Sequence, residues 1–204
     1  MPAVKPRSWH QNLINERESY NDLVTWEMLL IAAVRVAGSL PVLRWAFVGA
    51  ILAMLMDLSD LFIRDLVDLG GVKDYQRFDK WLDQVYMLAF LTVALRWDAV
   101  PRNIAIGLYA FRLAGFVTFE VSGERDILLF FPNVFEFWFV FVAGVQFFNV
   151  RFSYSRAQLA AALPLLLAGK LLHEYSLHVG RWFDGFSSLE AVEAVWNWLT
   201  APFW

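Results

Sequence analysis

Six apolar segments, separated by short polar stretches, set the pattern of this 204-residue chain. They cover residues 22–39, 42–64, 79–97, 102–119, 128–149 and 157–178. A helix needs ~20 mostly apolar residues to cross the hydrocarbon of a membrane, and each segment has about that length. Pro41 separates the first two segments at a point where a helix should end or bend. The pattern predicts an all-α, polytopic membrane protein, built as a bundle of about six transmembrane helices.

The two ends of the chain differ from this pattern. Residues 1–21 form a polar segment that lacks the short apolar core and small-residue cleavage site of a signal peptide. Residues 22–178 form the predicted transmembrane domain. Residues 179–204 form an aromatic tail, in which Ser188 can cap a short helix. Its tryptophans suit a helix in the membrane interface and equally a helix packed on the domain, so both alternatives stay open.

Composition supports the membrane assignment. Apolar residues make up 59% of the chain and charged residues 18%, whereas a soluble domain is ~45–50% apolar. The chain has no cysteine, which excludes disulfides, thiolate metal sites and cysteine nucleophiles. The formal net charge of −3 gives no reason to expect nucleic acid as a partner. Membrane lipid is therefore the expected environment.

The distribution of Lys and Arg predicts the orientation. With a cytoplasmic N-terminus, nine basic residues lie on the cytoplasmic side and five on the opposite side, in agreement with the positive-inside rule. The nine are Lys5, Arg7, Arg17, Arg64, Lys73, Arg77, Lys80, Arg125 and Arg181. The five are Arg44, Arg96, Arg102, Arg151 and Arg156. This topology places both termini and the loop between the second and third segments in the cytoplasm.

Two pairs of aspartates lie at the facing ends of the second and third segments. Asp57 and Asp60 are three residues apart, and Asp79 and Asp83 are four apart, so each pair shares one face of its helix. Because the loop between the helices is short, the pairs are expected to converge where the membrane meets water. Clustered carboxylate oxygens are the ligands that Mg²⁺, Mn²⁺ and Ca²⁺ prefer. The four aspartates therefore predict a divalent-metal site.

Structural roles are an alternative for each aspartate. Asp79 can occupy the first turn of its helix, where the helix dipole favours an acidic side chain. Asp57 and Asp60 can lie at the water-exposed end of their helix, with Asp60 paired to Arg64 four residues later. Asp68 can replace one of the ligands if the second helix runs longer. The spacing alone leaves the metal site and these roles open.

Other ionisable residues in the apolar segments are weaker signals. Arg35 and Lys170 are expected to extend their charged ends toward the membrane surface. Glu136 has Arg112 as a candidate partner for a buried ion pair. The histidines of the last segment are spaced one residue too far apart for the H-E-x-x-H motif of a zinc site, so packing or interfacial roles are expected for them.

The order of the aspartates resembles the CDP-alcohol phosphatidyltransferase family. That family carries the signature D-x-x-D-G-x-x-A-R-x8-G-x-x-x-D-x-x-x-D across its second and third membrane helices. Asp57-x-x-Asp60 is similar to the first pair of the signature and Asp79-x-x-x-Asp83 to the second, with one more residue between the pairs. The six predicted spans and the segment VTWEMLLIAAVRVAG before the first pair agree with the layout of the family.

The resemblance implies a fold, an activity and a set of site residues. It implies a six-helix enzyme, usually a homodimer, that transfers a phosphatidyl or phospho-alcohol group from a CDP-linked lipid or alcohol. The first pair and Asp79 would hold two Mg²⁺ or Mn²⁺ ions, and Asp83 would complete the site and act as general base. The basic residues implied are Arg64 or Lys80 for the donor phosphates and Arg112 or Arg125 for an anionic acceptor.

The signature is incomplete in this chain at its small residues. Leu61 stands where the family has its first glycine, and Arg64 is one place early. Asp74 or Tyr75 stands at the second glycine, depending on where the extra residue lies. In the family those glycines let the CDP group approach the helix backbone, and larger side chains would crowd it. A non-catalytic membrane subunit that retains the fold within a larger complex is therefore a second interpretation.

Overall fold

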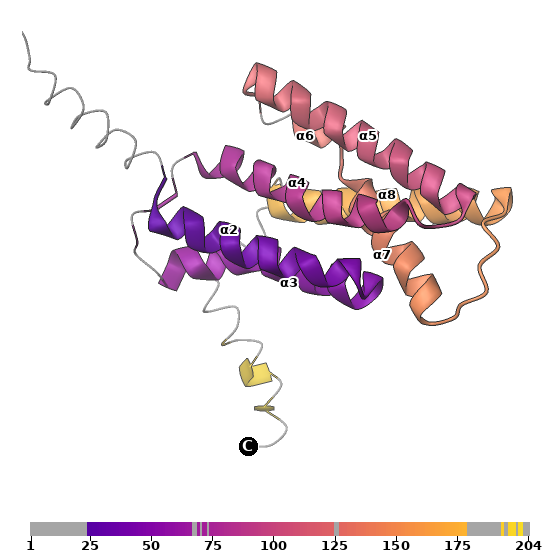
Figure 1. The fold of residues 1–204 in the computed structure, drawn as a ribbon, viewed down its shortest axis with the longest axis horizontal. Helices are drawn as coiled ribbons and strands as arrows, with labels where there is room; N and C mark the ends of the chain where they lie inside the picture. Colours follow the sequence, from indigo (N-terminus) through magenta and orange to yellow (C-terminus); the bar gives the residue numbers. More distant parts are fainter. Residues whose placement is uncertain are drawn as a thin grey trace, which may run out of the picture.

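The computed structural model describes residues 24–66, 69, 71–72, 74–124 and 127–178, together with 193, 196–198 and 200–201 (Figure 1). Within these residues the chain is helical and contains no β-strand, which confirms the all-α prediction. The elements are α2 (Trp26–Ser39), the 3₁₀-helix η1 (Leu40–Leu43), α3 (Ala46–Leu66), α4 (Tyr75–Ala94), α5 (Ala99–Ser122), α6 (Ile127–Phe130), α7 (Val134–Phe147) and α8 (Arg156–His178). The predicted interfacial helix of the tail lies mostly outside the described residues.

The first two predicted spans form a tight helical hairpin. Thr25 caps α2, because its hydroxyl accepts a hydrogen bond from an amide of the first turn. The helix ends just before Pro41, which lies in η1, as the sequence predicts. Gly49 of α3 packs so closely on η1 that a Cβ there would overlap backbone atoms of Pro41 and Val42. The crossing of α3 over η1 therefore requires glycine at this position.

Aromatic side chains fill the core between α3, α4, α5 and α7. Phe90 of α4 stacks on Phe139 of α7, with ring centroids 4.2 Å apart, and both rings are fully buried. Trp138 is fully buried as well, and its indole N–H donates to the Pro101 carbonyl of α5, 3.1 Å away. An indole N–H buried without an acceptor would cost free energy. This hydrogen bond thus fixes how α7 packs on α5.

The fifth predicted span is not one continuous helix. The structure divides it into α6, which ends at Phe130, and α7, which begins at Val134. Pro132 lies in the break, because a proline has no amide hydrogen and disfavours a helix at the residue before it. With 14 residues, α7 extends ~21 Å. This length is short of the ~30 Å of hydrocarbon in a typical bilayer.

Two helical segments are long and apolar enough to cross a membrane, judged by length and composition. They are Trp26–Leu43, which consists of α2 and η1, and Ala99–Ser122, which is α5. In their apolar stretches only 33% and 28% of the residues are buried inside the molecule. The other residues of each stretch are partly or fully exposed, and several large apolar side chains are among them. Six transmembrane helices remain a prediction.

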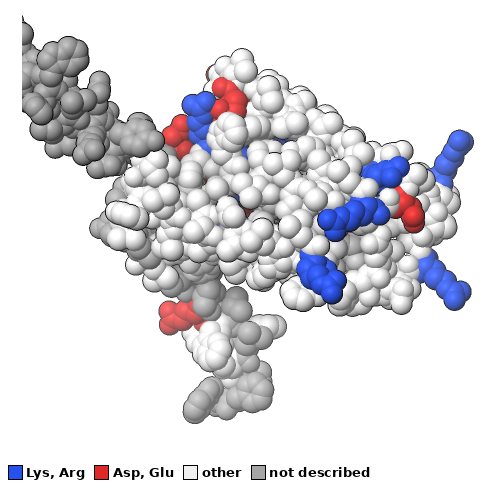
Figure 2. Space-filling view, in the orientation of Figure 1, with Lys and Arg blue, Asp and Glu red and all other residues white. Residues whose placement is uncertain are grey.

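Basic side chains gather at one end of the bundle (Figure 2). The connections α2–α3, α4–α5 and α7–α8 meet there and carry, in or next to them, Arg44, Arg96, Arg102, Arg151 and Arg156. At the other end, only Arg77 and Lys80 of the nine basic residues counted from the sequence have described side chains. The predicted orientation therefore stays a prediction.

Replacing Gly49 with alanine is expected to destabilise the protein, because the added Cβ meets the backbone of η1 rather than a flexible side chain. We expect a loss of about 1–3 kcal/mol, measured as a lower midpoint of thermal unfolding in detergent. Gly107→Ala is the matched control, since nothing lies within 4 Å of a Cβ at that position of α5. It should stabilise slightly, by up to ~1 kcal/mol. Equal midpoints for the two variants would contradict the close packing.

Candidate metal centre

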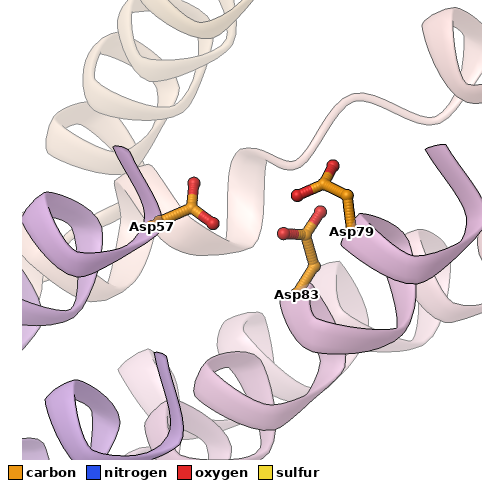
Figure 3. Close-up of side chains that lie close together, drawn as sticks. All are labelled: Asp57, Asp79 and Asp83. Carbon is orange, nitrogen blue, oxygen red and sulfur yellow. The ribbon is translucent and has the colours of Figure 1, made fainter. Parts of the chain in front are cut away.

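Carboxylates from α3 and α4 meet between the two helices. Asp57 and Asp60 project from one face of α3, and Asp79 and Asp83 from one face of α4. Oxygen atoms of Asp57, Asp79 and Asp83 all lie within 4.8 Å of one another. Figure 3 shows these three carboxylates pointing toward one another from the two helices. Residues that are 26 positions apart in the sequence thus form one acidic cluster.

The guanidinium of Arg35 lies at the centre of the four carboxylates. Its Nη1 donates to Asp79 Oδ1 at 2.7 Å, and its Nη2 donates to Asp83 Oδ1 at 2.7 Å and to Asp57. Nη1 also lies 3.6 Å from Asp60 Oδ2. The Arg35 side chain is only 2% exposed. The prediction that Arg35 extends to the membrane surface is therefore wrong, because the acids hold it inside the bundle.

Lys80 and Tyr75 complete the network. Lys80 Nζ donates to Asp79 Oδ2 at 2.7 Å and to Asp83 Oδ2 at 2.8 Å. The hydroxyl of Tyr75 donates to Asp60 Oδ2 at 2.6 Å. Both oxygens of Asp79 and both oxygens of Asp83 thus accept a hydrogen bond from a cation, which is the stronger kind of hydrogen bond. α2, α3 and α4 are joined through one set of charges.

The cluster is closed on one side and open on the other. Side-chain exposure is 4% for Asp60 and 8% for Asp83. It rises to 19% for Asp79 and 34% for Asp57. A cation from solution would therefore reach the cluster on the side of Asp57 and Asp79.

A pocket of about 130 Å³ lies beside the cluster, lined by Tyr75, Gln76, Asp79, Lys80, Phe119 and Leu128. Ligand pockets usually measure ~300–1,000 Å³, so this pocket between α4 and the end of α5 is smaller than a typical ligand site. Arg77 of α4 joins these helices by donating to Glu120 of α5 at 2.9 and 2.5 Å. These hydrogen bonds raise the pKa of Arg77 above its usual value. Separation of the helices requires this ion pair to break.

The donor set fits a hard divalent cation. Ligand bonds to Mg²⁺ and Ca²⁺ are ~2.0–2.6 Å long, so two ligands on opposite sides of one ion lie ~4–5 Å apart. The 4.8 Å limit on the three carboxylates falls within that range. Asp57, Asp79 and Asp83 can therefore hold a metal ion. Asp60, the fourth predicted ligand, is not part of this group of three; its side chain is 4% exposed and accepts the hydrogen bond of Tyr75.

The basic residues implied by the resemblance are only partly brought to the cluster. Lys80 lies in it and lines the pocket. Arg112 is buried on α5, where its Nη1 donates to the Phe131 carbonyl at 2.7 Å. Its Nε has no hydrogen-bond partner among the described residues. The side chain of Arg64 and the whole of Arg125 lie outside the described residues.

Glu136 pairs with Lys170 rather than with Arg112. Lys170 Nζ of α8 lies 3.3 Å from Glu136 Oε2 of α7, and Asn133 donates to the same oxygen at 3.1 Å. Asn133 also donates to the Tyr86 hydroxyl at 3.3 Å, and Lys170 is 6% exposed. The expectation that Lys170 extends to the membrane surface is therefore wrong, because the acid that it neutralises lies inside the bundle.

The start of α4 has larger side chains than the family signature has there. Asp74 adopts φ 44° and ψ 52°, a left-handed conformation that glycine adopts without strain. The ring of Tyr75 lines the pocket and its hydroxyl reaches Asp60. A nucleotide that approached the backbone here would meet this ring. The side chain of Leu61 lies outside the described residues.

Sequence reasoning does not find Arg35 or Tyr75 as members of the site. For Arg35 the available signal is a lone arginine in an apolar segment, since an ionisable residue at membrane depth is expected to have a partner. For Tyr75 the signal is its position four residues before Asp79, which places both on one helix face. Neither signal identifies the partner.

Comparison with known proteins adds no assignment. No protein-family model, curated protein or solved structure matches the chain. The resemblance to CDP-alcohol phosphatidyltransferases therefore depends on the aspartate spacing and the geometry described above.

Tyr75→Phe is expected to destabilise the protein, because it removes a donor from the buried Asp60 carboxylate. A buried acceptor left short of a donor costs ~1–3 kcal/mol, measurable by thermal unfolding in detergent. Tyr109→Phe is the control, since its hydroxyl has no hydrogen-bond partner in the described part of the chain; its midpoint should stay near that of the parent protein. If Tyr75→Phe also unfolds at the parent midpoint, the hydroxyl does not support Asp60.

Proposed function

We propose that the chain is a multi-pass membrane protein that transfers a phosphatidyl or phospho-alcohol group from a CDP-linked donor to an alcohol. The observation that carries the proposal is the meeting of Asp57, Asp79 and Asp83 between α3 and α4. The signature of CDP-alcohol phosphatidyltransferases requires its two aspartate pairs to share one site, and this geometry supports that arrangement. Mg²⁺ or Mn²⁺ is the proposed cofactor, because the donors are carboxylates.

The proposed reaction is substitution at phosphorus. The alcohol oxygen attacks, the bond from the phosphorus to the bridging oxygen breaks, and CMP leaves with that oxygen. Asp83 would take the hydroxyl proton through a second lone pair, because each of its oxygens already accepts from Arg35 or Lys80. The charges of Arg35 and Lys80 would stabilise the negative charge of the leaving phosphate. A bound metal ion would neutralise the donor pyrophosphate.

Basic residues near the cluster are proposed to bind phosphate groups. Lys80 is the described residue best placed for the donor, since it lines the pocket. Arg112 is proposed for an anionic acceptor, because its buried Nε has no protein partner among the described residues. Arg64 and Arg125 keep the roles that the resemblance implies.

Membrane lipid is the proposed environment, with the aspartate site and both termini on the cytoplasmic side, where nucleotides and Mg²⁺ are found. The outward-facing apolar surfaces of Trp26–Leu43 and Ala99–Ser122 support a membrane location. A homodimer is proposed from the family resemblance alone.

A non-catalytic membrane subunit is the second candidate, and two observations favour it. The guanidinium of Arg35 already contacts the carboxylates that would hold a metal ion. The ring of Tyr75 occupies the start of α4, where the family has space for a nucleotide. In this case the network would have a structural role, joining α2, α3 and α4, and the apolar surface would pack against partners in a larger complex.

The test of activity is the release of CMP from CDP-diacylglycerol by purified protein, with Mg²⁺ or Mn²⁺ and a panel of alcohols. Asp83→Asn should lower the rate by ~10²-fold or more, because an amide does not accept the proton of the attacking hydroxyl. Asp57→Asn should raise the Mn²⁺ concentration that gives half-maximal rate, since it removes charge from the ligand set. Asp98→Asn, at the opposite end of the bundle, is the control and should change neither quantity.

No CMP release with any alcohol, together with no Mn²⁺ binding, would reject the transferase and favour the subunit. If the three variants unfold at the same midpoint as the parent protein, a decrease in their rate of CMP release is not caused by unfolding.

Reporter fusions should place both termini in the cytoplasm and give six crossings, because six apolar segments alternate with polar loops. Fusion points after residues 41, 72, 99, 125 and 153 separate the six segments. An odd number of crossings would contradict the proposed topology.

A further inference from the structure

Five arginines lie at the end of the bundle opposite the aspartate cluster (Figure 2). This basic end consists of Arg44, Arg96, Arg102, Arg151 and Arg156. None of the five side chains forms an ion pair or a hydrogen bond with another residue that the structure describes. Asp98 is the one acidic residue in the three described connections that meet there. The basic end therefore has five positive charges against one negative charge.

The helices themselves give no reason for arginine at two of these positions. Arg102 lies in the first turn of α5, and Arg156 is the first residue of α8. The N-terminus of a helix carries a partial positive charge, so it disfavours a cation and attracts an anion. Four of the five arginines are exposed and Arg102 is partly exposed, so a partner outside the chain has access to their guanidinium groups.

Large aromatic side chains lie beside the arginines. Trp45, which follows Arg44, is 62% exposed, and Phe147 and Phe148 are 58% and 64% exposed. The rings of both phenylalanines contact Phe47 of α3, at centroid distances of 5.3 and 5.4 Å. Aromatic and basic side chains together are typical of the boundary between membrane hydrocarbon and water. This combination favours a lipid surface over a nucleic acid, whose phosphate backbone has no apolar layer beside it.

The two segments that are long and apolar enough to cross a membrane lead into the basic end. Trp26–Leu43 ends directly before Arg44, and Arg102 lies in the first turn of Ala99–Ser122. With these segments across the hydrocarbon, both arginines lie at the level of the lipid phosphates. A guanidinium forms paired hydrogen bonds with a phosphate group. The charge excess of the basic end favours lipids whose headgroup has a net negative charge.

We infer that the basic end binds the phosphate groups of anionic membrane lipids in preference to zwitterionic lipids. The inference rests on the proposed membrane location, it holds for either orientation of the protein, and it does not require transferase activity. The arginines contact the headgroups, while Trp45, Phe147 and Phe148 contact the adjoining acyl chains. Each arginine near the lipid surface is expected to contribute about fivefold to the affinity.

The test is native mass spectrometry of the purified full-length protein in detergent, titrated with phosphatidylglycerol or with phosphatidylcholine of the same acyl chains. The parent protein should bind phosphatidylglycerol at least ~tenfold more tightly. This preference should decrease as the ammonium acetate concentration rises, because salt screens exposed charges. Arg44→Gln, Arg151→Gln and Arg156→Gln combined should remove most of the preference, whereas lysine at the same three positions should retain most of it.

Single variants provide matched controls. Arg44→Gln should weaken phosphatidylglycerol binding about fivefold. Arg77→Gln makes the same change of charge at the opposite end of the bundle and should leave the affinity unchanged. Asp98→Asn removes the acid of the basic end and should strengthen binding. Equal affinities for Arg44→Gln and Arg77→Gln would overturn the inference.

Three further results would also overturn the inference. One is equal binding of the two lipids by the parent protein. The second is displacement of phosphatidylglycerol by an equal concentration of glycerol 3-phosphate, which would assign the arginines to a free phosphate. The third is recovery of the parent protein in the soluble fraction of lysed cells, which would reject the membrane location as well. Lipid preference without CMP release upholds the inference and rejects the transferase, whereas CMP release without lipid preference does the reverse.

Discussion

The interior of this protein depends on the neutralisation of clustered carboxylates by Arg35. One guanidinium from α2 contacts acids of both α3 and α4, so three helices meet at a single buried cation. Removing one partner of a buried ion pair costs about 3–5 kcal/mol, because the other charge remains unpaired. The contact of these three helices therefore depends on charge as well as on apolar packing, and the site and the bundle are stabilised by the same interactions.

Beside its aromatic core, the bundle buries several charged side chains and exposes several large apolar ones. Arg35, Asp60, Glu136 and Lys170 are all buried, while large aliphatic side chains of α2, α3 and α5 are exposed. Two of the helical segments that expose apolar side chains are long and apolar enough to cross a membrane. The buried charges are grouped into two networks, one around Arg35 and one around Glu136.

The sequence predicts the features that depend on local spacing. Asp57 and Asp79 come together because each pair lies on one helix face and the helices are neighbours in the chain. The end of α2 before Pro41 follows from the chemistry of one residue. The sequence does not identify partners that are distant in the chain. A charged residue in an apolar segment has the same sequence pattern whether its side chain extends to the membrane surface or pairs with an acid inside the bundle. The sequence therefore predicts that Arg35 and Lys170 extend to the membrane surface, although both are buried against acids.

The pair of Glu136 and Lys170 has a consequence for the order in which α7 and α8 are buried. α8 packs against α7 in the described structure, and this ion pair joins them. Removing one partner of a buried ion pair costs about 3–5 kcal/mol, because the other charge stays uncompensated. An α8 buried without α7 would bear that cost for Lys170, as α7 would for Glu136. The two helices thus gain by packing on each other before either is buried in the bundle, as a hairpin whose charges already face each other.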